Sequence, residues 1–533
     1  MKRTIVVILL VGSFIFVSYK ACSNHSGKKT VRVTEQELLD KIKGGWVGKA
    51  YGVSFGGPTE FRYQGEIIEG PLSLDKEGLK WLPWQDDMYV NMAFLKTLAE
   101  EGFSATIEDF AKDFAYGGFL LWHANGQGRQ NILSGIKPGL SGHPYYNPHA
   151  DDIDFQIECD FIGLVSPGLP ESSKEICDKV GHIMNYGDGV YGGYFVTAMY
   201  AAAFIEDDPY KIVKYGLSML PKGSGYAQII RDVLNWYEKY PDDWKKVWKK
   251  IEDKYNRDLC PWGVKSKFNI QARLNGSYIA LGILYGNGDL KKTVEIATRC
   301  GQDSDCNPGN AGGVVGTMLG YSRLPKDIKE AMKPYMKEVF CFTPFSIDSA
   351  SKVCLRLAVQ NILRNNGNKR GDTLEFAIQS FVNKDEEVEV SFPTLEPIDK
   401  FSIYDDRIKW VGDWSKVDYK GDEVMRRSDN PGDYMEVNFE GSAVYVQGDL
   451  RYDQGILEAY IDGKLMQERD MYLPKKWELA NQSTAVWITG LPFGNHKLVV
   501  KVTGRKNPKS EGITISLGKV VTYRGEVAKL PKR

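Results

Sequence analysis

The first part of the chain carries hydrophobic residues at helical spacing. In DDMYVNMAFLKTLAEEG, for example, Met88, Met92 and Leu95 share one face of a helix. The stretch YGGYFVTAMYAAAFIED at 191–207 has the same spacing, and its small residues permit close packing against other helices. Since no convincing alternation of period two interrupts this region, we predict an all-α domain over residues 35–341.

The pattern changes after the helical region. A mixed connecting segment, 342–399, precedes short stretches in which hydrophobic and polar residues alternate, as around Val444. Turn residues separate these stretches, and Asp462-Gly463 is typical of a β-hairpin. We therefore predict a jelly-roll-like β-sandwich over 400–533. The fold class expected for the whole chain is multidomain, an all-α bundle followed by an all-β accessory domain.

The N-terminus has the pattern of a targeting segment. Two basic residues precede an apolar run, 5–17, that is too short to span a bilayer and indicates a signal peptide over 1–22. Ala21 before Cys22 resembles a bacterial lipoprotein processing site, although the residue before them is not the small one expected. We expect an exported cell-envelope protein, lipidated at Cys22 and followed by a polar tether, 23–34; ordinary cleavage nearby is the alternative.

Composition and charge narrow the function classes. The chain is 42% hydrophobic and 26% charged, as in globular proteins, and its 533 residues predict about two or three domains. A net charge of −1 gives no basic field for nucleic acid. Seven cysteines beyond Cys22 are too thinly spread for a disulfide framework, and Cys300 and Cys306 lack nearby histidines for a zinc site.

Two acidic pairs precede helical stretches. Asp86 and Asp87 begin one helix, whereas Asp303 and Asp305 precede a stretch, 306–320, in which glycine recurs at near-helical spacing. Either pair alone is explained equally well by helix capping. Four converging carboxylates, however, would repel one another and take up protons unless a cation lay between them. Oxygen ligands of this kind favour Mg²⁺.

Three sequence blocks resemble those of a known family. GGWVGKAYGVSFGGPTEF (44–61), QDDMYVNMAFL (85–95) and GQDSDCNPGNAGGVVG (301–316) are similar, in this order, to the signature blocks of the ADP-ribosylglycohydrolase family. The similarity extends over about residues 35–335. It implies an all-α bundle with a two-magnesium site at its centre.

The resemblance also implies roles for individual residues. Asp86, Asp87, Asp303 and Asp305 match the metal ligands, and Glu60 matches a glutamate that lies beside the substrate ribose. We expect metal-bound sugar hydroxyls, a polarised water and an oxocarbenium-like transition state, with Glu60 and Asp87 as catalytic residues. For Glu60, a role in activating water or protonating the leaving group competes with that of a solvated turn residue.

Some positions depart from the family pattern. Gln85 stands where the family has a hydroxyl residue, Cys306 stands where it often has Thr or Ser, and Val53 stands where an aspartate is common. A thiol is a poor Mg²⁺ ligand, so one of the two metal positions is expected to be weakened. The cofactor is then one or two Mg²⁺ ions, with Ca²⁺ or Mn²⁺ possible, and the substrate need not be ADP-ribose.

Loops rich in Gly, Asn, His and Asp lie between the acidic blocks and are expected to face a pocket. His149, next to Asp151 and Asp152, is a weaker candidate for a further ligand. Loop hydrogen bonds or helix caps are the alternative for each of the candidate substrate contacts, which are His123, Asn125, Arg129, Asn147, Asp154, Asp160 and Asp188.

The predicted sandwich resembles galactose-binding accessory modules of exported glycosidases at the level of architecture. Its aromatic residues are candidates for stacking on sugar rings, although core packing is the commoner role. The residues in question are Trp410, Trp414, Tyr452, Trp477 and Trp487.

These features favour an exported, metal-dependent glycosyl hydrolase that acts on a glycan or glycoside and contacts the membrane only through a lipid anchor. An exported enzyme meets glycans, and a sandwich module could hold a polymer. Two alternatives remain: a hydrolase of ADP-ribosyl-proteins or ADP-ribose, and a non-catalytic sugar-binding lipoprotein, which the changes at Gln85 and Cys306 favour slightly.

Overall fold

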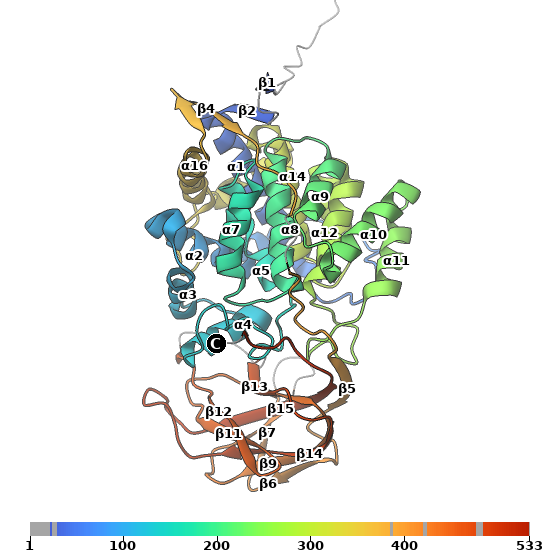
Figure 1. Cartoon of the computed structure of the whole chain (residues 1–533), viewed down its shortest axis with the longest axis vertical. Helices are drawn as coiled ribbons and strands as arrows, with labels where there is room; N and C mark the ends of the chain where they lie inside the picture. Colours follow the sequence, from blue (N-terminus) through green and yellow to red (C-terminus); the bar gives the residue numbers. More distant parts are fainter. Residues whose placement is uncertain (1–21, 24–28, 384–386, 419–423, 476–482, 532–533) are drawn as a thin grey trace, which may run out of the picture.

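The computed structural model describes residues 22–23, 29–383, 387–418, 424–475 and 483–531. It consists of a helical body and a β-sandwich, stacked along the long axis of the molecule (Figure 1). This is the multidomain all-α and all-β fold class predicted from the sequence. Within the described ranges, no helix has both the length and the apolar character needed to cross a bilayer.

The helical body contains all the α-helices of the described chain. They are α1 (Glu35–Gly56), α2 (Asp86–Glu101), α3 (Ile107–Tyr116), α4 (His123–Leu133), α5 (Asp154–Ile157), α6 (Asp160–Leu164), α7 (Pro170–Gly181), α8 (Asp188–Ala203), α9 (Pro209–Ser218), α10 (Gly225–Lys239), α11 (Trp244–Tyr255), α12 (Ala272–Gly286), α13 (Leu290–Arg299), α14 (Cys306–Leu319), α15 (Lys326–Met332) and α16 (Ile347–Arg364).

The central feature of this body is the contact between α1 and α14, whose backbones touch. Glycines on α1 face glycines on α14: a Cβ atom added to Gly48 would overlap the carbonyl of Gly312, and one added to Gly44 would overlap that of Gly316. Because a glycine has no side chain, the two helix axes can approach closely. The glycine spacing seen in the sequence therefore serves helix packing.

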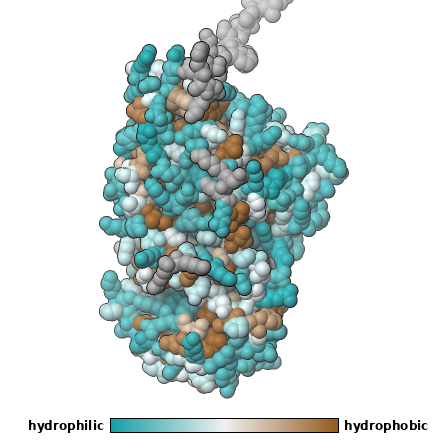
Figure 2. Space-filling model, viewed as in Figure 1, coloured by the Kyte–Doolittle hydropathy of each residue, from teal (hydrophilic) through white to brown (hydrophobic). Residues whose placement is uncertain are grey.

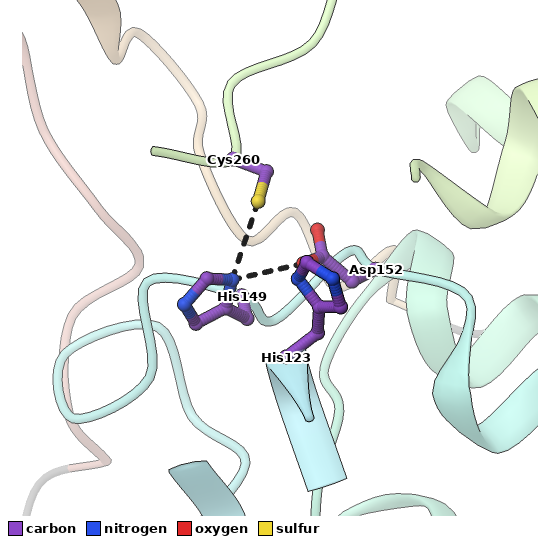
Figure 3. A group of neighbouring side chains, drawn as sticks. All are labelled: His123, His149, Asp152 and Cys260. Atoms are coloured by element: carbon purple, nitrogen blue, oxygen red, sulfur yellow. Dashed lines mark hydrogen bonds and ion pairs between the residues drawn. The ribbon is translucent and has the colours of Figure 1, made fainter. Parts of the chain in front are cut away.

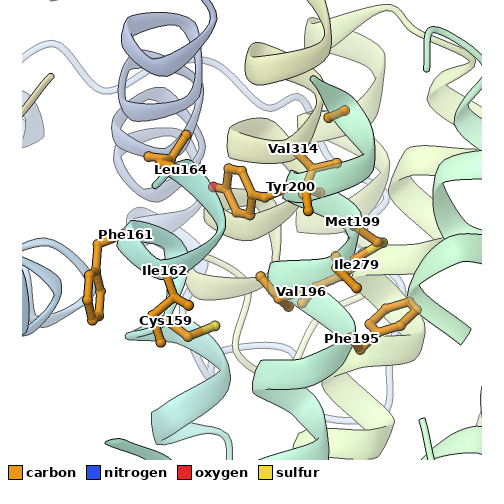
Figure 4. Packing of buried hydrophobic residues seen from close by; sticks show 14 of the residues in the cluster. Cys159, Phe161, Ile162, Leu164, Phe195, Val196, Met199, Tyr200, Ile279 and Val314 are labelled. Atoms are coloured by element: carbon orange, nitrogen blue, oxygen red, sulfur yellow. The ribbon is translucent and has the colours of Figure 1, made fainter. Parts of the chain in front are cut away.

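Hydrophobic side chains of α6, α8, α12 and α14 fill the space around this pair (Figure 4). Phe161, Tyr200, Ile279 and Val314 are all completely buried. The hydroxyl of Tyr200 donates a 2.6 Å hydrogen bond to Asp160, so the large polar tip is satisfied inside the core.

A small sheet lies beside the helical body and includes the second half of the expected polar tether. Its strand order is β1 (Cys22–Ser23), β2 (Lys29–Thr34), β4 (Thr373–Ala377) and β3 (Asn368–Arg370). Val31 and Val33 on β2 alternate with more exposed residues and pack on the helical core, which is why the second half of the expected tether is a strand. The first residues of the expected signal peptide lie outside the described residues.

The expected connecting segment, 342–399, needs correction. It begins with α16, whose buried residues belong to the hydrophobic core of the helical body, and continues into β3 and β4 of the small sheet. A boundary near residue 383 therefore describes the molecule better than one at residue 341.

The sandwich consists of two antiparallel sheets. One has the order β13-β10-β15-β8-β7, with β5 also paired to β15, and the other has the order β12-β11-β14-β9-β6. The strands are β5 (Glu396–Phe401), β6 (Ile408–Val411), β7 (Ser415–Asp418), β8 (Val424–Ser428), β9 (Tyr434–Gly441), β10 (Ala443–Gly448), β11 (Ile456–Ile461), β12 (Lys464–Asp470), β13 (Ser483–Ile488), β14 (Gly494–Val502) and β15 (Ile515–Arg524).

The hairpin signal at Asp462-Gly463 is confirmed. These two residues join β11 to β12, where Ile461 pairs with Lys464, and both have positive φ angles of 51° and 83°. Two central residues with positive φ define the turn that matches the twist of a hairpin.

The sandwich docks on the helical body through direct polar and apolar contacts. The indole of Trp487 donates to the carbonyl of Pro144 (2.9 Å), and the hydroxyl of Tyr523 donates to that of Leu259 (3.1 Å). Val264 of the helical body shares a buried hydrophobic cluster with these two aromatic residues. A cavity of about 310 Å³ opens at this junction, between α4 and the strands of the sandwich.

The aromatic residues proposed to stack on sugars have other positions. Trp487 is part of the domain junction, and Trp414 is buried in the core of the sandwich with Trp410 packed against it at a ring distance of 4.9 Å. Tyr452 is half-buried beside Lys475, and Trp477 lies outside the described residues. On the face shown in Figure 2, hydrophobic side chains form separate patches on a mostly hydrophilic surface.

Candidate metal and catalytic centre

Two loops meet at the end of the glycine-packed helix pair. The backbone N–H of Phe61 donates to the carbonyl of Gln302 (2.9 Å), and the hydroxyls of Thr59 and Ser304 are 2.8 Å apart. A Cβ atom at Gly56 would overlap the Ser304 carbonyl, so the close packing of α1 and α14 continues into these loops. The segment that carries Glu60 is thereby held against the segment that carries the second acidic pair.

The carboxylates expected to bind metal converge there. Ligand atoms of Glu60, Asp303 and Asp305 all lie within 4.8 Å of one another, as do those of Asp87, Asp305 and Cys306. Asp305 belongs to both groups and joins them. The carboxylate of Asp86, at the start of α2, is half-buried at the rim and accepts a 3.0 Å hydrogen bond from the backbone N–H of Asp87.

Several carboxylate oxygens in this centre lack partners. Asp87 Oδ2, Asp303 Oδ1 and Asp305 Oδ1 are buried, and none has a hydrogen-bond partner among the residues that the structure describes. Burial and the charge of Asp87 raise the pKa of Asp305 to about 6, and burial and Asp87 raise that of Asp86 to about 8. A hard divalent cation with oxygen ligands would satisfy these atoms, so the donor set fits Mg²⁺.

Glu60 lies at the solvent side of the centre. Its side chain is exposed on one face, yet desolvation by the surrounding walls and the charges of Asp305 and Asp86 raise its pKa well above the usual range. A carboxyl group with a raised pKa can donate or accept a proton during catalysis.

Lys49 was not singled out in the sequence. Its ammonium group is completely buried, 3.1 Å from Asp87 Oδ1 and 2.8 Å from Asp160 Oδ2, and it donates to the carbonyl of Ile157 (2.9 Å). Burial alone would lower the pKa of Lys49, but Asp160 and Asp87 outweigh it and raise that pKa. Lys49 therefore stays charged and holds one oxygen of Asp87. A lysine within the apolar, glycine-rich run GGWVGKAYG is the signal that could have revealed it.

Cys306 places a thiol among the carboxylates of this centre. Burial and the charge of Asp303 raise its pKa well above the usual range, so it remains a neutral thiol beside Asp87 and Asp305. A neutral thiol is not a Mg²⁺ ligand. The group that contains Glu60, Asp303 and Asp305 is thus the better oxygen site, and Gln85 lies half-buried just before α2.

Three of the expected substrate contacts are buried structural residues. Asp160 holds Lys49 and also accepts hydrogen bonds from Tyr200 (2.6 Å) and Asn310 (3.0 Å). The amide of Asn147 donates to two backbone carbonyls, at 3.1 and 2.8 Å. The guanidinium of Arg129 donates to three, and burial lowers its pKa to about 9. These hydrogen bonds are all internal and give the three residues a structural role, while their contact with substrate stays a prediction.

Asp154, Asn125 and Asp188 also have local hydrogen bonds, and their expected contact with substrate stays a prediction. Asp154 accepts hydrogen bonds from the backbone N–H of Ala124 (3.2 Å) and Asn125 (3.1 Å) and so caps α4. The side chain of Asn125 donates to Glu158 (2.5 Å), and Asp188 accepts from the backbone N–H of Tyr226 (3.0 Å). The alternative of caps and loop hydrogen bonds accounts for these interactions.

Glu158 is a further acidic residue that the sequence reading missed. It is completely buried, and its Oε2 atom has no hydrogen-bond partner among the described residues. Burial and the charges of Asp154, Asp86 and Asp87 raise its pKa well above the usual range. Its neighbours Ile157 and Cys159 are apolar, but the surrounding stretch DFQIECDFIG holds two more acids, so the sequence alone did not mark it. His123 belongs to a different cluster, described below.

Comparison with known proteins assigns the chain to a family. The model of the ADP-ribosylglycohydrolase family matches residues 34–360, and the chain belongs to that family. A solved structure described as an "ADP-ribosylglycohydrolase-related protein complex" covers 61% of this chain and 99% of its own, with 12% identity and a TM-score of 0.39. A Paenibacillus xanthan lyase structure covers 28% of this chain and 15% of its own, with 16% identity and a TM-score of 0.19.

A curated relative points to glycoside chemistry. An "A type blood alpha-D-galactosamine galactosaminidase" from Flavonifractor plautii is 32% identical over 110 residues, which are 20% of this chain and 10% of that protein. The match thus spans about a tenth of the relative. The family to which this chain belongs is generally metal-dependent.

Proposed function

We propose that this protein is an exported, metal-dependent glycosyl hydrolase that cleaves a carbohydrate glycoside. The observation that carries the proposal is the convergence of three unpartnered carboxylate oxygens, from Asp87, Asp303 and Asp305, beside the partly exposed Glu60. Such a centre combines an oxygen-ligand set for a divalent ion with a proton-carrying carboxyl group at the solvent side.

The residues divide into two roles. Asp303 and Asp305 would hold Mg²⁺ next to Glu60, with the free oxygen of Asp87 beside Asp305 and Asp86 at the rim. When bound, the ion supplies positive charge for orienting sugar hydroxyls and for acidifying water. Lys49 occupies the other oxygen of Asp87 and the thiol of Cys306 offers no hard ligand, which favours one ion over two.

Glu60 is the proposed general acid or base. Its raised pKa allows it to carry a proton to the leaving oxygen or nitrogen, and the same carboxylate can then accept a proton from water. The buried negative charges around it stabilise the positive charge that develops on the sugar as the glycosidic bond breaks.

Three observations support a carbohydrate substrate. The signal-peptide pattern at the N-terminus would place the protein where glycans occur, and the sandwich gives it a second body beside the hydrolase body. The third is the galactosaminidase relative. Export and lipidation of Cys22 belong to this proposal, and palmitate labelling of wild type but not of Cys22→Ala would support them.

The test compares substrates and variants together. Purified protein with and without Mg²⁺ is incubated with a panel of glycans and with ADP-ribosylated protein, and released sugar is measured. We expect Mg²⁺-dependent release from a glycan, lost in Asp303→Asn and Glu60→Gln. Glu66→Gln, an exposed carboxyl paired with Lys267, is the matched control and should retain activity.

The other outcomes decide between the remaining functions. Aspartate-dependent release of ADP-ribose, with no release from any glycan, would replace the carbohydrate substrate by an ADP-ribosylated one. Sugar binding without release of any product under all metal conditions would make the protein a binding lipoprotein.

A further inference from the structure

A second group of ligand-type side chains lies at the domain junction. His123 is the first residue of α4, His149 and Asp152 belong to the loop before α5, and Cys260 belongs to the loop between α11 and α12. Figure 3 shows these four side chains turned toward a common point. Segments far apart in the sequence are thus brought together around atoms that commonly bind metals.

The distances within this cluster approach those of a zinc site. His149 Nδ1 is 2.9 Å from Asp152 Oδ2 and 3.3 Å from Cys260 Sγ, and His123 Nδ1 is 3.4 Å from Asp152 Oδ2. All four ligand atoms lie within 4.8 Å of one another. Around a tetrahedral Zn²⁺, neighbouring ligand atoms are about 3.3 to 3.6 Å apart, so shifts of about 1 Å or less would complete the geometry.

Hydrogen bonding alone explains this cluster poorly. The single Nδ1 atom of His149 faces both the carboxylate and the thiol, although one N–H can donate well to only one of them. His123 Nδ1 is buried and has no hydrogen-bond partner among the described residues. A cation at the centre would accept lone pairs from both imidazoles.

We propose that His123, His149, Asp152 and Cys260 form a Zn²⁺ site. Two neutral imidazoles, one carboxylate and one thiolate carry a total charge that balances a divalent ion. This balance matters because His149, Asp152 and Cys260 are at most 3% exposed. Imidazole and thiolate ligands select Zn²⁺ and not Mg²⁺, so this site is chemically distinct from the aspartate centre.

The surroundings of the ligands are already fixed. Asn147 Oδ1 accepts a 2.9 Å hydrogen bond from the backbone N–H of His149, and the amide of Asn185 donates to the carbonyl of Asp152 (2.8 Å). Asp258 accepts from the backbone N–H of Cys260 (2.9 Å). Such supporting hydrogen bonds are typical of metal sites. Asn147, expected to contact substrate, thus holds a ligand loop.

Four protein ligands leave no open position, so the site is structural. The loop of Cys260 is also where the sandwich docks: Tyr523 donates to the carbonyl of Leu259, and Lys400 donates to those of Trp262 and Val264. Zinc would therefore tie this loop to α4 and fix the surface on which the sandwich rests.

The test measures zinc and its ligands directly. The full chain is expressed with added zinc, dialysed, and analysed for bound metal by mass spectrometry, and a second sample is loaded with Co²⁺. We expect about one zinc per chain and a thiolate-to-cobalt charge-transfer band in the near ultraviolet. Cys260→Ser and His149→Ala should lose both signals. Cys300→Ser, another buried cysteine, and Asp303→Asn should retain them.

The cobalt spectrum of the wild-type chain keeps the proposal testable even if a variant misfolds. Wild type with no stoichiometric zinc and no thiolate band would overturn it. Zinc lost from Asp303→Asn but retained in Cys260→Ser would equally overturn it, because the metal would then belong to the aspartate centre.

Discussion

The aspartate centre and the His–Asp–Cys cluster differ in chemistry, access and construction. The first offers only oxygen from carboxylates and is open to solvent through Glu60, whereas the second mixes nitrogen, oxygen and sulfur and is enclosed at the domain junction. An exchangeable hard ion suits the first, and a permanently held borderline ion suits the second. One chain can thus keep two divalent ions apart by ligand type alone.

Their supports differ as well. Asp303 and Asp305 directly precede α14, whose backbone touches that of α1 through glycine, as at Gly48 and Gly312. In the cluster, His149, Asp152 and Cys260 sit on loops held by the side chains of Asn147, Asn185 and Asp258, and only His123 belongs to a helix. The first arrangement tolerates no added atoms, and the second depends on individual hydrogen bonds.

The largest contrast is expected in activity. Asp303→Asn removes one charged oxygen from the aspartate centre while preserving its shape, and should lower kcat/KM by about a thousand-fold. Cys260→Ser, at the other cluster, should change it by less than about ten-fold. Initial rates with saturating Mg²⁺ on the cleaved glycoside measure both. Equal losses in the two variants would contradict the division into a catalytic and a structural site.

The next effect concerns stability. Gly48→Ala places a methyl group against the Gly312 carbonyl and should lower the free energy of unfolding of the helical body by about 3 kcal/mol. Gly70→Ala is the matched control because a Cβ there meets nothing within 4 Å among the described residues, and should change it by less than about 0.5 kcal/mol. Denaturant titration followed by circular dichroism measures both. A similar loss in the two variants would contradict backbone packing as the support of the aspartate centre.

The second cluster should affect stability more locally. Cys260→Ser should lower the free energy of unfolding by about 2 kcal/mol. It should also increase protease cleavage between the two bodies, because the docking loop loses its connection to α4. Asp303→Asn should leave the cleavage pattern unchanged. Limited proteolysis with mass spectrometry measures the cleavage pattern. An unchanged pattern in Cys260→Ser would contradict a role of the cluster in docking the sandwich.

The smallest effect depends on pH. Metal-free Asp305, with its pKa raised to about 6, binds its proton more tightly in the folded than in the unfolded chain. Raising the pH from about 4 to 7 therefore destabilises the metal-free protein, because the unfolded carboxyl ionises near pH 4 whereas the folded one keeps its proton up to about pH 6. Added Mg²⁺ should stabilise the protein more at the higher pH, by at least about 1 kcal/mol. Melting curves at both values test this, and a larger Mg²⁺ effect at low pH would contradict it.

The sequence predicted the features that leave a local pattern. Helical spacing, the alternation in the sandwich and the Asp462-Gly463 turn each depend on neighbouring residues, and the fold class followed from them. The two acidic pairs and Glu60 were identified through motif order, and the structure brings Glu60, Asp87, Asp303 and Asp305 together, with Asp86 at the rim. In each case the information lay within a short window.

The remaining features depend on contacts between distant segments. The ligand cluster joins α4, the loop before α5 and the loop after α11, so no spacing within one motif reveals it. Lys49 and Asp160 became a pair only through packing, and Arg129 turned inward because backbone carbonyls at the end of α3 needed a donor. Polar residues in loops indicate function or capping equally well until their partners are known.

The small sheet has a consequence for orientation. Figure 1 shows β1, β2 and β4 at one end of the molecule and the sandwich at the other. A chain tethered through Cys22 would stand on this sheet, with the helical body as a rigid spacer and the sandwich as its outermost part. The helical body would then set the distance between the anchor and the sandwich. The sandwich would meet extracellular polymer before the aspartates do.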